Sequence, residues 1–370
     1  MEALLQKLWY GGRALAWPVW PLSLLFQAVS VSRRRRQQRA AAAEELSLPV
    51  VVVGNISVGG TGKTPLLIAL AQALQQAGLR PGIVSRGYGG KAPHYPFSVT
   101  PASDPAESGD EALLISAATG CPVVVDPDRL SAVRQLEAEG RCDVILSDDG
   151  LQHYRMPRTV EMVVIDGQRG LGNGFCLPAG PLRESSDRLA TVDFVVVNGE
   201  PAPALLNQLA RAGVTLRDDA VAGFGETTSE TPQAGKPVSE KPRPGKVMLH
   251  RIALEPAQLR TLKPGQALPP SDWQGLRQVH AVAGIGHPER FFATLESLGF
   301  DVIRHPFPDH HEFVAEDLAF GDGLPVLMTA KDAVKCQPFA EDHHWVLDVR
   351  MRIPEALLTA LLLQLRASGA

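Results

Sequence analysis

The feature that most constrains this chain is a glycine-rich turn between an apolar run and a helical pattern. Four consecutive valines, residues 50–53, precede the turn, and a leucine-rich helical pattern follows it from Pro65. The turn itself consists of Ser57, Val58, Gly59, Gly60, Thr61, Gly62, Lys63 and Thr64. Glycines let backbone N–H groups approach an anion closely, and a helix N-terminus adds unpaired donors and the positive end of a dipole.

We therefore predict that residues 57–64, here called the phosphate loop, bind the phosphates of a nucleotide. Lys63 would reach the β- and γ-phosphates, and Thr64 would offer its hydroxyl to Mg²⁺. Ser57 stands where the usual motif has its first glycine, so the match is incomplete. The alternative interpretation is an ordinary tight turn from a strand into a helix.

Composition indicates a folded protein with two domains. The chain has 370 residues, of which 45% are hydrophobic and 21% charged, and its net charge of −4 gives no basic field for nucleic acid. Its four cysteines are scattered and indicate reduced thiols rather than a disulfide framework. We expect no nucleic-acid partner, and no feature implies a stable protein partner.

The N-terminal segment differs from this average. Residues 14–31 carry only three polar side chains, include two tryptophans and two prolines, and lead directly into four arginines, residues 33–36, and Arg39. This pattern favours a membrane-associated helix that lies in the interface over a cleaved signal peptide. Five arginines near an anionic leaflet would contribute up to roughly 5 kcal/mol. The alternative is a helix that docks on the core of the protein itself.

Short apolar runs alternate with helical patterns from residue 48 onward, which predicts a doubly wound, mostly parallel sheet of the P-loop NTPase type. The predicted division has four parts: an N-terminal helix and basic flank (1–45), a P-loop kinase domain (46–226), a polar linker or long loop (227–246) and a smaller α/β domain (247–370). A helix is expected over 314–320 in the last part. The final helix, over 354–365, could pack on either domain.

A second candidate site follows an apolar strand that ends in Asp148 and Asp149. Two adjacent acids at the end of a strand are costly unless a cation neutralises them, and the ends of parallel strands gather ligands. We predict Mg²⁺ ligands at Asp148, Asp149 and Thr64, with Glu111 and Gln152 as further candidates. An Asp-Gly turn with solvated carboxylates is the alternative.

Asp110 and Glu111 open a predicted helix after a glycine. Asp110 could be a general base that accepts a hydroxyl proton from a phosphate acceptor. The alternative, a helix cap beside a first-turn acid, is common and purely structural.

Histidines and two loops complete the candidates. A histidine pair in the second domain, His310 and His311, could tune a carboxylate or lie on the surface; neither this pair nor residues 343–344 has regular zinc-ligand spacing. The loops 85–90 and 177–184 each carry an arginine that could hold an anionic acceptor. The candidate substrate-binding residues are Tyr88, His153, Arg183 and Glu184.

Together these pieces resemble the tetraacyldisaccharide 4′-kinases of lipid A synthesis. The resemblance rests on residues 54–65, 85–88, 109–111, 148–153, 177–184 and 329–336, and it covers most of the chain. It implies that ATP donates its γ-phosphoryl group to the 4′-hydroxyl of a tetraacylated glucosamine disaccharide 1-phosphate, giving lipid IVA. It also implies Mg²⁺, the cytoplasmic face of the bacterial inner membrane, and catalysis by Lys63 and by a base at Asp110. His310 is our match for a histidine that assists this base, with His311 the close alternative.

Two other functions remain open at this point. A membrane-associated GTPase or ATPase could act as a switch or targeting factor, but residues 329–332 depart by one position from the usual guanine-selecting spacing. A cytosolic P-loop ligase would leave the N-terminal segment unexplained.

Overall fold

The computed structural model describes residues 2–215 and 247–368. The strands are β1 (Val50–Gly54), β2 (Pro81–Ser85), β3 (Phe97–Val99), β4 (Val123–Val125), β5 (Val144–Asp148), β6 (Val160–Asp166), β7 (Phe194–Asn198), β8 (Val214–Thr215), β9 (Val247–Thr261), β10 (Ala267–Leu268), β11 (Gln278–Ala283), β12 (Asp301–Pro306), β13 (Val326–Thr329) and β14 (His344–Arg352). The α-helices are α1 (Glu2–Tyr10), α2 (Arg13–Ala16), α3 (Trp20–Ala41), α4 (Lys63–Gln76), α5 (Pro105–Ser108), α6 (Asp110–Thr119), α7 (Arg129–Glu139), α8 (Pro203–Arg211), α9 (Pro288–Ser297), α10 (Ala330–Cys336) and α11 (Glu355–Ala367).

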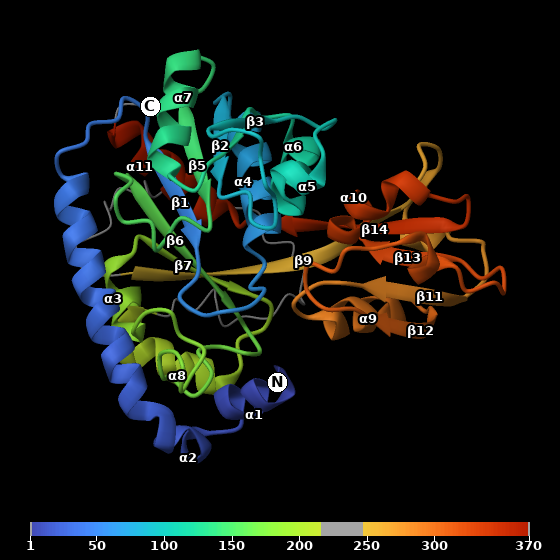
Figure 1. The fold of residues 1–370 in the computed structure, drawn as a ribbon, viewed down its shortest axis with the longest axis horizontal. Coiled ribbons are helices and arrows are strands. Elements are labelled where there is room, and N and C mark those ends of the chain that lie inside the picture. Colours follow the sequence, from blue (N-terminus) through green and yellow to red (C-terminus); the bar gives the residue numbers. More distant parts are fainter. Residues whose placement is uncertain (1, 216–246, 369–370) are drawn as a thin grey trace, which may run out of the picture.

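Within these ranges the strands form one sheet that runs through two lobes (Figure 1). The first lobe has the order β9-β7-β6-β1-β5-β2-β4-β3, parallel except at the β3 edge. Helices α4, α6 and α11 cover one face of this sheet, and α7 and α8 cover the other. The prediction of a doubly wound, mostly parallel α/β sheet is confirmed. Strand β1 lies between β5 and β6, so the phosphate loop leaves the middle of the sheet.

Strand β9 joins the lobes, because it pairs in parallel with β7 of the first lobe and antiparallel with β14 of the second. The second lobe continues in the order β14-β13-β11-β12, with α9 on one face and α10 on the other. Helix α11 then returns to the first lobe, where its leucines pack in the same cluster as those of α4. The predicted smaller domain, described here over residues 247–368, therefore contributes to both lobes.

The structure differs from the prediction in several elements, among them β3, α8 and α10, which the sequence patterns did not predict. The helix expected over 314–320 is a short 3₁₀ turn, η5 (Ala315–Leu318), and the long strand β9 was not predicted. The predicted linker 227–246 lies outside the described residues.

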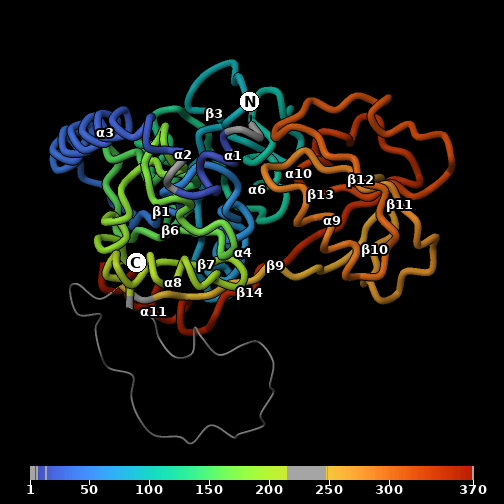
Figure 2. The backbone as a smooth tube through the Cα atoms, turned by 90° about the horizontal axis from the view of Figure 1, so that it is seen from below, coloured from blue at the N-terminus to red at the C-terminus, as the bar shows by residue number. Residues whose placement is uncertain are grey.

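Helix α3 runs along the side of the first lobe, as the second view shows (Figure 2). One face docks: Ser23 is buried and its hydroxyl donates to the Cys176 carbonyl at 2.7 Å, and Phe26 packs against the core. Leu22, Leu25 and other apolar side chains of the opposite face are exposed. Among the described residues, no helix combines the length and apolarity needed to cross a bilayer.

Candidate active site

A cavity of about 1040 Å³ opens between the two lobes and helix α3. The phosphate loop and the end of β5 form its floor, the first turns of α9 and α10 line it from the second lobe, and Arg33, Arg34 and apolar residues of α3 line it from the N-terminal helix. Because the ends of parallel strands open toward it, this is the position at which ligands bind to such sheets.

The backbone of the phosphate loop is set by Gly62, which precedes the first residue of α4. Its φ of +90° lies in the left-handed region, and a Cβ added there would lie 2.3 Å from the Asn198 amide nitrogen. That nitrogen donates to the Thr61 carbonyl at 3.1 Å. Helix α4 therefore begins at Lys63 with its unpaired N–H groups at the cavity, the arrangement that favours a bound anion.

Lys63 and Arg183 meet at Asp149. The ammonium lies 3.5 Å and the guanidinium 3.2 Å from its carboxylate oxygens. The arginine reaches this point because its backbone N–H donates to the Ile56 carbonyl at 2.7 Å, which holds the 177–184 loop beside the phosphate loop. Burial raises the pKa of Asp149, but the two cations outweigh it and lower the pKa overall.

Asp148 has a carboxylate oxygen that accepts no hydrogen bond from the described residues. It is buried, and its Oδ2 accepts a 3.4 Å hydrogen bond from the Ser85 hydroxyl. Its Oδ1 is buried and has no hydrogen-bond partner within the described part of the chain. Burial, together with the charges of Glu111 and Asp149, raises the pKa of Asp148. An orphaned carboxylate oxygen among acids fits a divalent cation, and Thr64 lines the same cavity.

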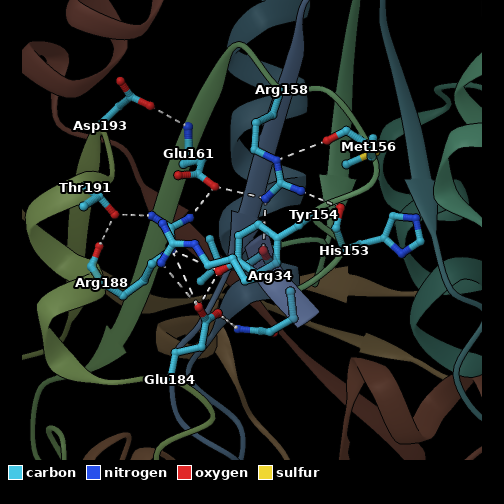
Figure 3. Close-up of polar contacts among 12 residues, drawn as sticks. Arg34, His153, Tyr154, Met156, Arg158, Glu161, Glu184, Arg188, Thr191 and Asp193 are labelled. Carbon is cyan, nitrogen blue, oxygen red and sulfur yellow. Dashed lines mark hydrogen bonds and ion pairs between the residues drawn. The ribbon is translucent and has the colours of Figure 1, made fainter. Parts of the chain in front are cut away.

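Glu184 lines the cavity and belongs to a network of charged and polar side chains that includes Tyr154 and Arg188 (Figure 3). The Gln152 amide donates to Glu184 and to the Asn55 carbonyl, each at 2.9 Å. Glu184 also accepts from the Tyr154 hydroxyl and lies 3.9 Å from Arg34 of helix α3. Gln152, a predicted metal ligand, and Glu184, a predicted substrate-binding residue, therefore line the cavity and are also held by protein partners.

The same network continues away from the cavity. Arg188 donates to the Tyr154 hydroxyl at 3.1 Å and pairs with Glu161, which also accepts from Arg158 at 3.0 Å. The predicted substrate residue His153 lies beside this network, where burial and the nearby Arg129 lower its pKa to about 4. An imidazole with so low a pKa is neutral at physiological pH.

Asp110 and His310 are brought together across the lobes. The Asp110 Oδ2 lies 3.2 Å from the His310 Nδ1, whereas His311 bonds to Asp317. The N-cap of α6 is Gly109 and not Asp110, so that part of the structural alternative is wrong. Both acids nevertheless lie in the first turn, where the Asp110 Oδ1 accepts from the Glu111 backbone N–H at 3.0 Å. His310 lines the cavity, and Asp110 lies behind it.

This pair is a charged one. Burial raises the pKa of Asp110, but the hydrogen bond with His310 and the charges of Lys331 and Lys335 outweigh it, so its pKa lies well below the usual value. The same hydrogen bond raises the pKa of His310. The ring of Tyr88, a predicted substrate residue, packs 4.9 Å from the imidazole.

Lys331 occupies the remaining corner of the cavity. Its ammonium lies 3.2 Å from both Glu111 and Asp309 and 3.4 Å from the His310 Nε2. Glu111, predicted as a metal ligand, is thus paired with a cation of the second lobe.

A second contact between the lobes forms at the phosphate loop. Arg290 of α9 donates to the side-chain amide oxygen (Oδ1) of Asn198 at 3.0 Å, and the amide nitrogen of Asn198 donates to the Thr61 carbonyl. A Cβ added at Gly286 would lie 3.3 Å from the Gly60 nitrogen. The lobes therefore touch at both ends of the cavity.

Comparisons with known proteins agree with this arrangement. A family model described as tetraacyldisaccharide-1-P 4′-kinase matches residues 15–366. The chain belongs to this family. Relatives named tetraacyldisaccharide 4′-kinase include one from Alkalilimnicola ehrlichii, 50% identical over 90% of this chain and 87% of its own length. Another, from Alcanivorax borkumensis, is 45% identical over 96% of this chain and 95% of its own length.

The fold is shared with a crystal structure of the "apo" form of LpxK from Aquifex aeolicus in complex with ATP. That structure matches with a TM-score of 0.69 at 23% identity and covers 95% of this chain and 99% of its own. The family resemblance drawn from the sequence motifs is confirmed.

Two lysines of α10 and one arginine of α7 were missed as candidates. Lys331 and Lys335 lie in the 329–336 motif, which carried the resemblance but suggested no chemistry of its own. Arg129 lines the cavity, is almost fully buried, and its Nε has no hydrogen-bond partner in the ranges that the structure describes. Its place directly after an N-capping aspartate looked purely structural in the sequence.

Proposed function

We propose that this chain transfers the γ-phosphoryl group of ATP to the 4′-hydroxyl of a tetraacylated glucosamine disaccharide 1-phosphate, giving lipid IVA. Membership of the kinase family supports this reaction over a GTPase switch or a ligase. The observation that carries the proposal is one cavity lined by the phosphate loop, two strand-end acids and His310, whose imidazole contacts Asp110 behind it.

The phosphate loop would stabilise the negative charge on the phosphoryl group that is transferred. Lys63 and the first amides of α4 would bind the β- and γ-phosphates, and Lys63 would be released from Asp149 toward the nucleotide. Asp148 and Thr64 would hold Mg²⁺, with Asp149 nearby. The ion, when bound, would neutralise charge on the phosphate oxygens.

The Asp110–His310 pair would take the proton of the attacking hydroxyl. His310 is the member at the cavity wall, and Asp110 orients its imidazole through the 3.2 Å contact with Nδ1. A neutral imidazole is needed to accept a proton, so activity should fall as the pH drops below the raised pKa of His310. Tyr88 would pack against the sugar beside it.

Acceptor binding would involve helix α3. The helix lines the cavity with Phe26 and Val29, which are suited to acyl chains, while its outer face exposes further apolar side chains. Arg33 and Arg34 also reach the cavity wall and would complement phosphate, as would Arg183. We propose that the helix lies in the cytoplasmic surface of the inner membrane, the location expected for this lipid substrate.

Transfer of labelled γ-phosphate to a defined tetraacyl disaccharide 1-phosphate tests the proposal. The full-length protein with Mg²⁺ should give a labelled lipid from ATP, and omission of the acceptor should leave ATP largely intact. Rapid GTP hydrolysis without lipid labelling would instead support the switch. Labelled lipid absent under all conditions would refute the kinase assignment.

A further inference from the structure

Lys335 of helix α10 contacts Asp110 and the loop that carries His310. Its ammonium lies 3.1 Å from the Asp110 Oδ2, the oxygen that also faces His310. The same ammonium donates to the His311 backbone carbonyl at 3.1 Å. One side chain thus links the carboxylate of the first lobe to the loop of the second lobe that carries the histidine.

Lys335 is separated from the cavity that a substrate would enter. It is not among the residues that line the cavity, its side chain is only 13% exposed, and its ammonium lies 6.0 Å from the centre of the Phe313 ring. Lys331, one turn earlier on the same helix, does line the cavity. Any effect of Lys335 on a reaction there must therefore pass through Asp110 and the His310 loop.

The loop needs such support because His310 has a φ of +62°, a conformation that side chains other than glycine seldom adopt. The neighbouring His311 is held by its backbone N–H, which donates to Pro308, and by its ring, which bonds to Asp317 at 2.9 Å. The bond from Lys335 to the His311 carbonyl is a third contact that holds this turn. A residue in a strained conformation persists only where its surroundings define it in this way.

We propose that Lys335 is a positioning residue that holds Asp110 and His310 in register across the lobes. The proposal rests on the proposed phosphoryl transfer, and it deepens that function by naming what assembles the pair. Because, among the described residues, the side-chain partners of the Asp110 Oδ2 are His310, Lys331 and Lys335 of the second lobe, the pair is complete only while the lobes meet as they do here.

The test compares Lys335→Met and Lys335→Arg with Arg260→Met as a matched control. Arg260 is a half-buried cation of the same lobe that pairs with Asp348 at 2.9 Å and does not line the cavity. Lys335→Met should lower kcat by about tenfold or more, as expected for a lost hydrogen bond to a charged group, while KM for ATP changes less than about twofold. Lys335→Arg should recover part of kcat, and Arg260→Met should leave it unchanged.

A double-mutant cycle separates positioning from general damage. If Lys335 acts in part through Asp110, Lys335→Met should cost less activity in Asp110→Asn than in wild type, because only its bond to the His311 carbonyl remains to be lost. This double variant removes both charges, so it remains informative if Lys335→Met alone does not fold. An unchanged kcat in folded Lys335→Met, or a further tenfold loss in the double variant, overturns the proposal.

A spectroscopic measurement keeps this inference separate from the kinase assignment. Imidazole ¹⁵N signals of His310 in the free protein should move in Lys335→Met and stay in place in Arg260→Met. Unmoved signals in a folded Lys335→Met variant overturn the positioning role. Inactivity of the wild-type protein refutes the proposed function instead, and the imidazole signals then still decide whether Lys335 positions His310.

Discussion

Replacing Gly62 by alanine tests the backbone geometry on which the phosphate site depends. The left-handed φ of +90° costs an alanine about 1–2 kcal/mol. The added Cβ would lie 2.3 Å from the Asn198 amide nitrogen, so Asn198 must move and lose its bond to Thr61, which costs about 1 kcal/mol more. We expect Gly62→Ala to lower the free energy of unfolding by about 2–3 kcal/mol and to weaken ATP binding.

The matched control is Gly60→Ala in the same loop. Gly60 is outside the left-handed region, and a Cβ there would meet no heavy atom within 4 Å. The free energy of unfolding of Gly60→Ala should stay within about 0.5 kcal/mol of wild type. Denaturant unfolding of the nucleotide-free protein measures both variants. Equal stability of Gly62→Ala and Gly60→Ala would refute the reasoning.

Three further predictions concern the histidine pair, the buried network and the N-terminal helix. Because the pKa of His310 is raised, its stabilising contribution is complete below about pH 6.5 and is lost as the pH rises through the raised value. The melting temperature of His310→Ala should therefore lie below that of wild type near pH 6, and the difference should shrink toward pH 9. The opposite trend would contradict the pairing. Arg188→Met removes one of the two arginines that pair with Glu161, together with the bond from Arg188 to the Tyr154 hydroxyl, and should cost about 1.5–3 kcal/mol in denaturant unfolding, whereas a cost below about 0.5 kcal/mol would be inconsistent with this network. Leu25 of α3 is 64% exposed, so Leu25→Glu should leave the melting temperature unchanged and reduce the fraction of protein that sediments with anionic vesicles. Undiminished sedimentation would argue against the helix as the membrane contact.

The phosphate site was predictable because its signals are local. Strand β1, the loop and helix α4 follow one another in the sequence, and the loop requires glycine at position 62 for a steric reason. Asp148 could be added because the end of any parallel strand beside β1 opens at the same edge. The family motifs extended this prediction to Asp110 and His310, and the structure brings those two side chains into contact.

Contacts that depend on how the lobes meet could not be predicted in the same way. Lys331 and Glu111 are 220 residues apart, and no sequence pattern shows that α10 faces α6. Strand β9 was missed because its residues lack the strict polar–apolar alternation of a half-buried strand and include Pro256. Nothing in the sequence indicates that one strand pairs with both lobes. Glu184 was considered for substrate binding, although its position between Tyr154 and Gln152 also gives it a structural role.

The central claim is that Lys63 and its loop stabilise the phosphoryl group during transfer to a lipid acceptor. The most direct measurement is single-turnover transfer of labelled γ-phosphate from ATP to the tetraacyl disaccharide 1-phosphate by wild type and Lys63→Ala, alongside unfolding of both. We predict that the variant folds normally and transfers at least about 100-fold more slowly. Wild-type rates in a folded Lys63→Ala protein would contradict the account.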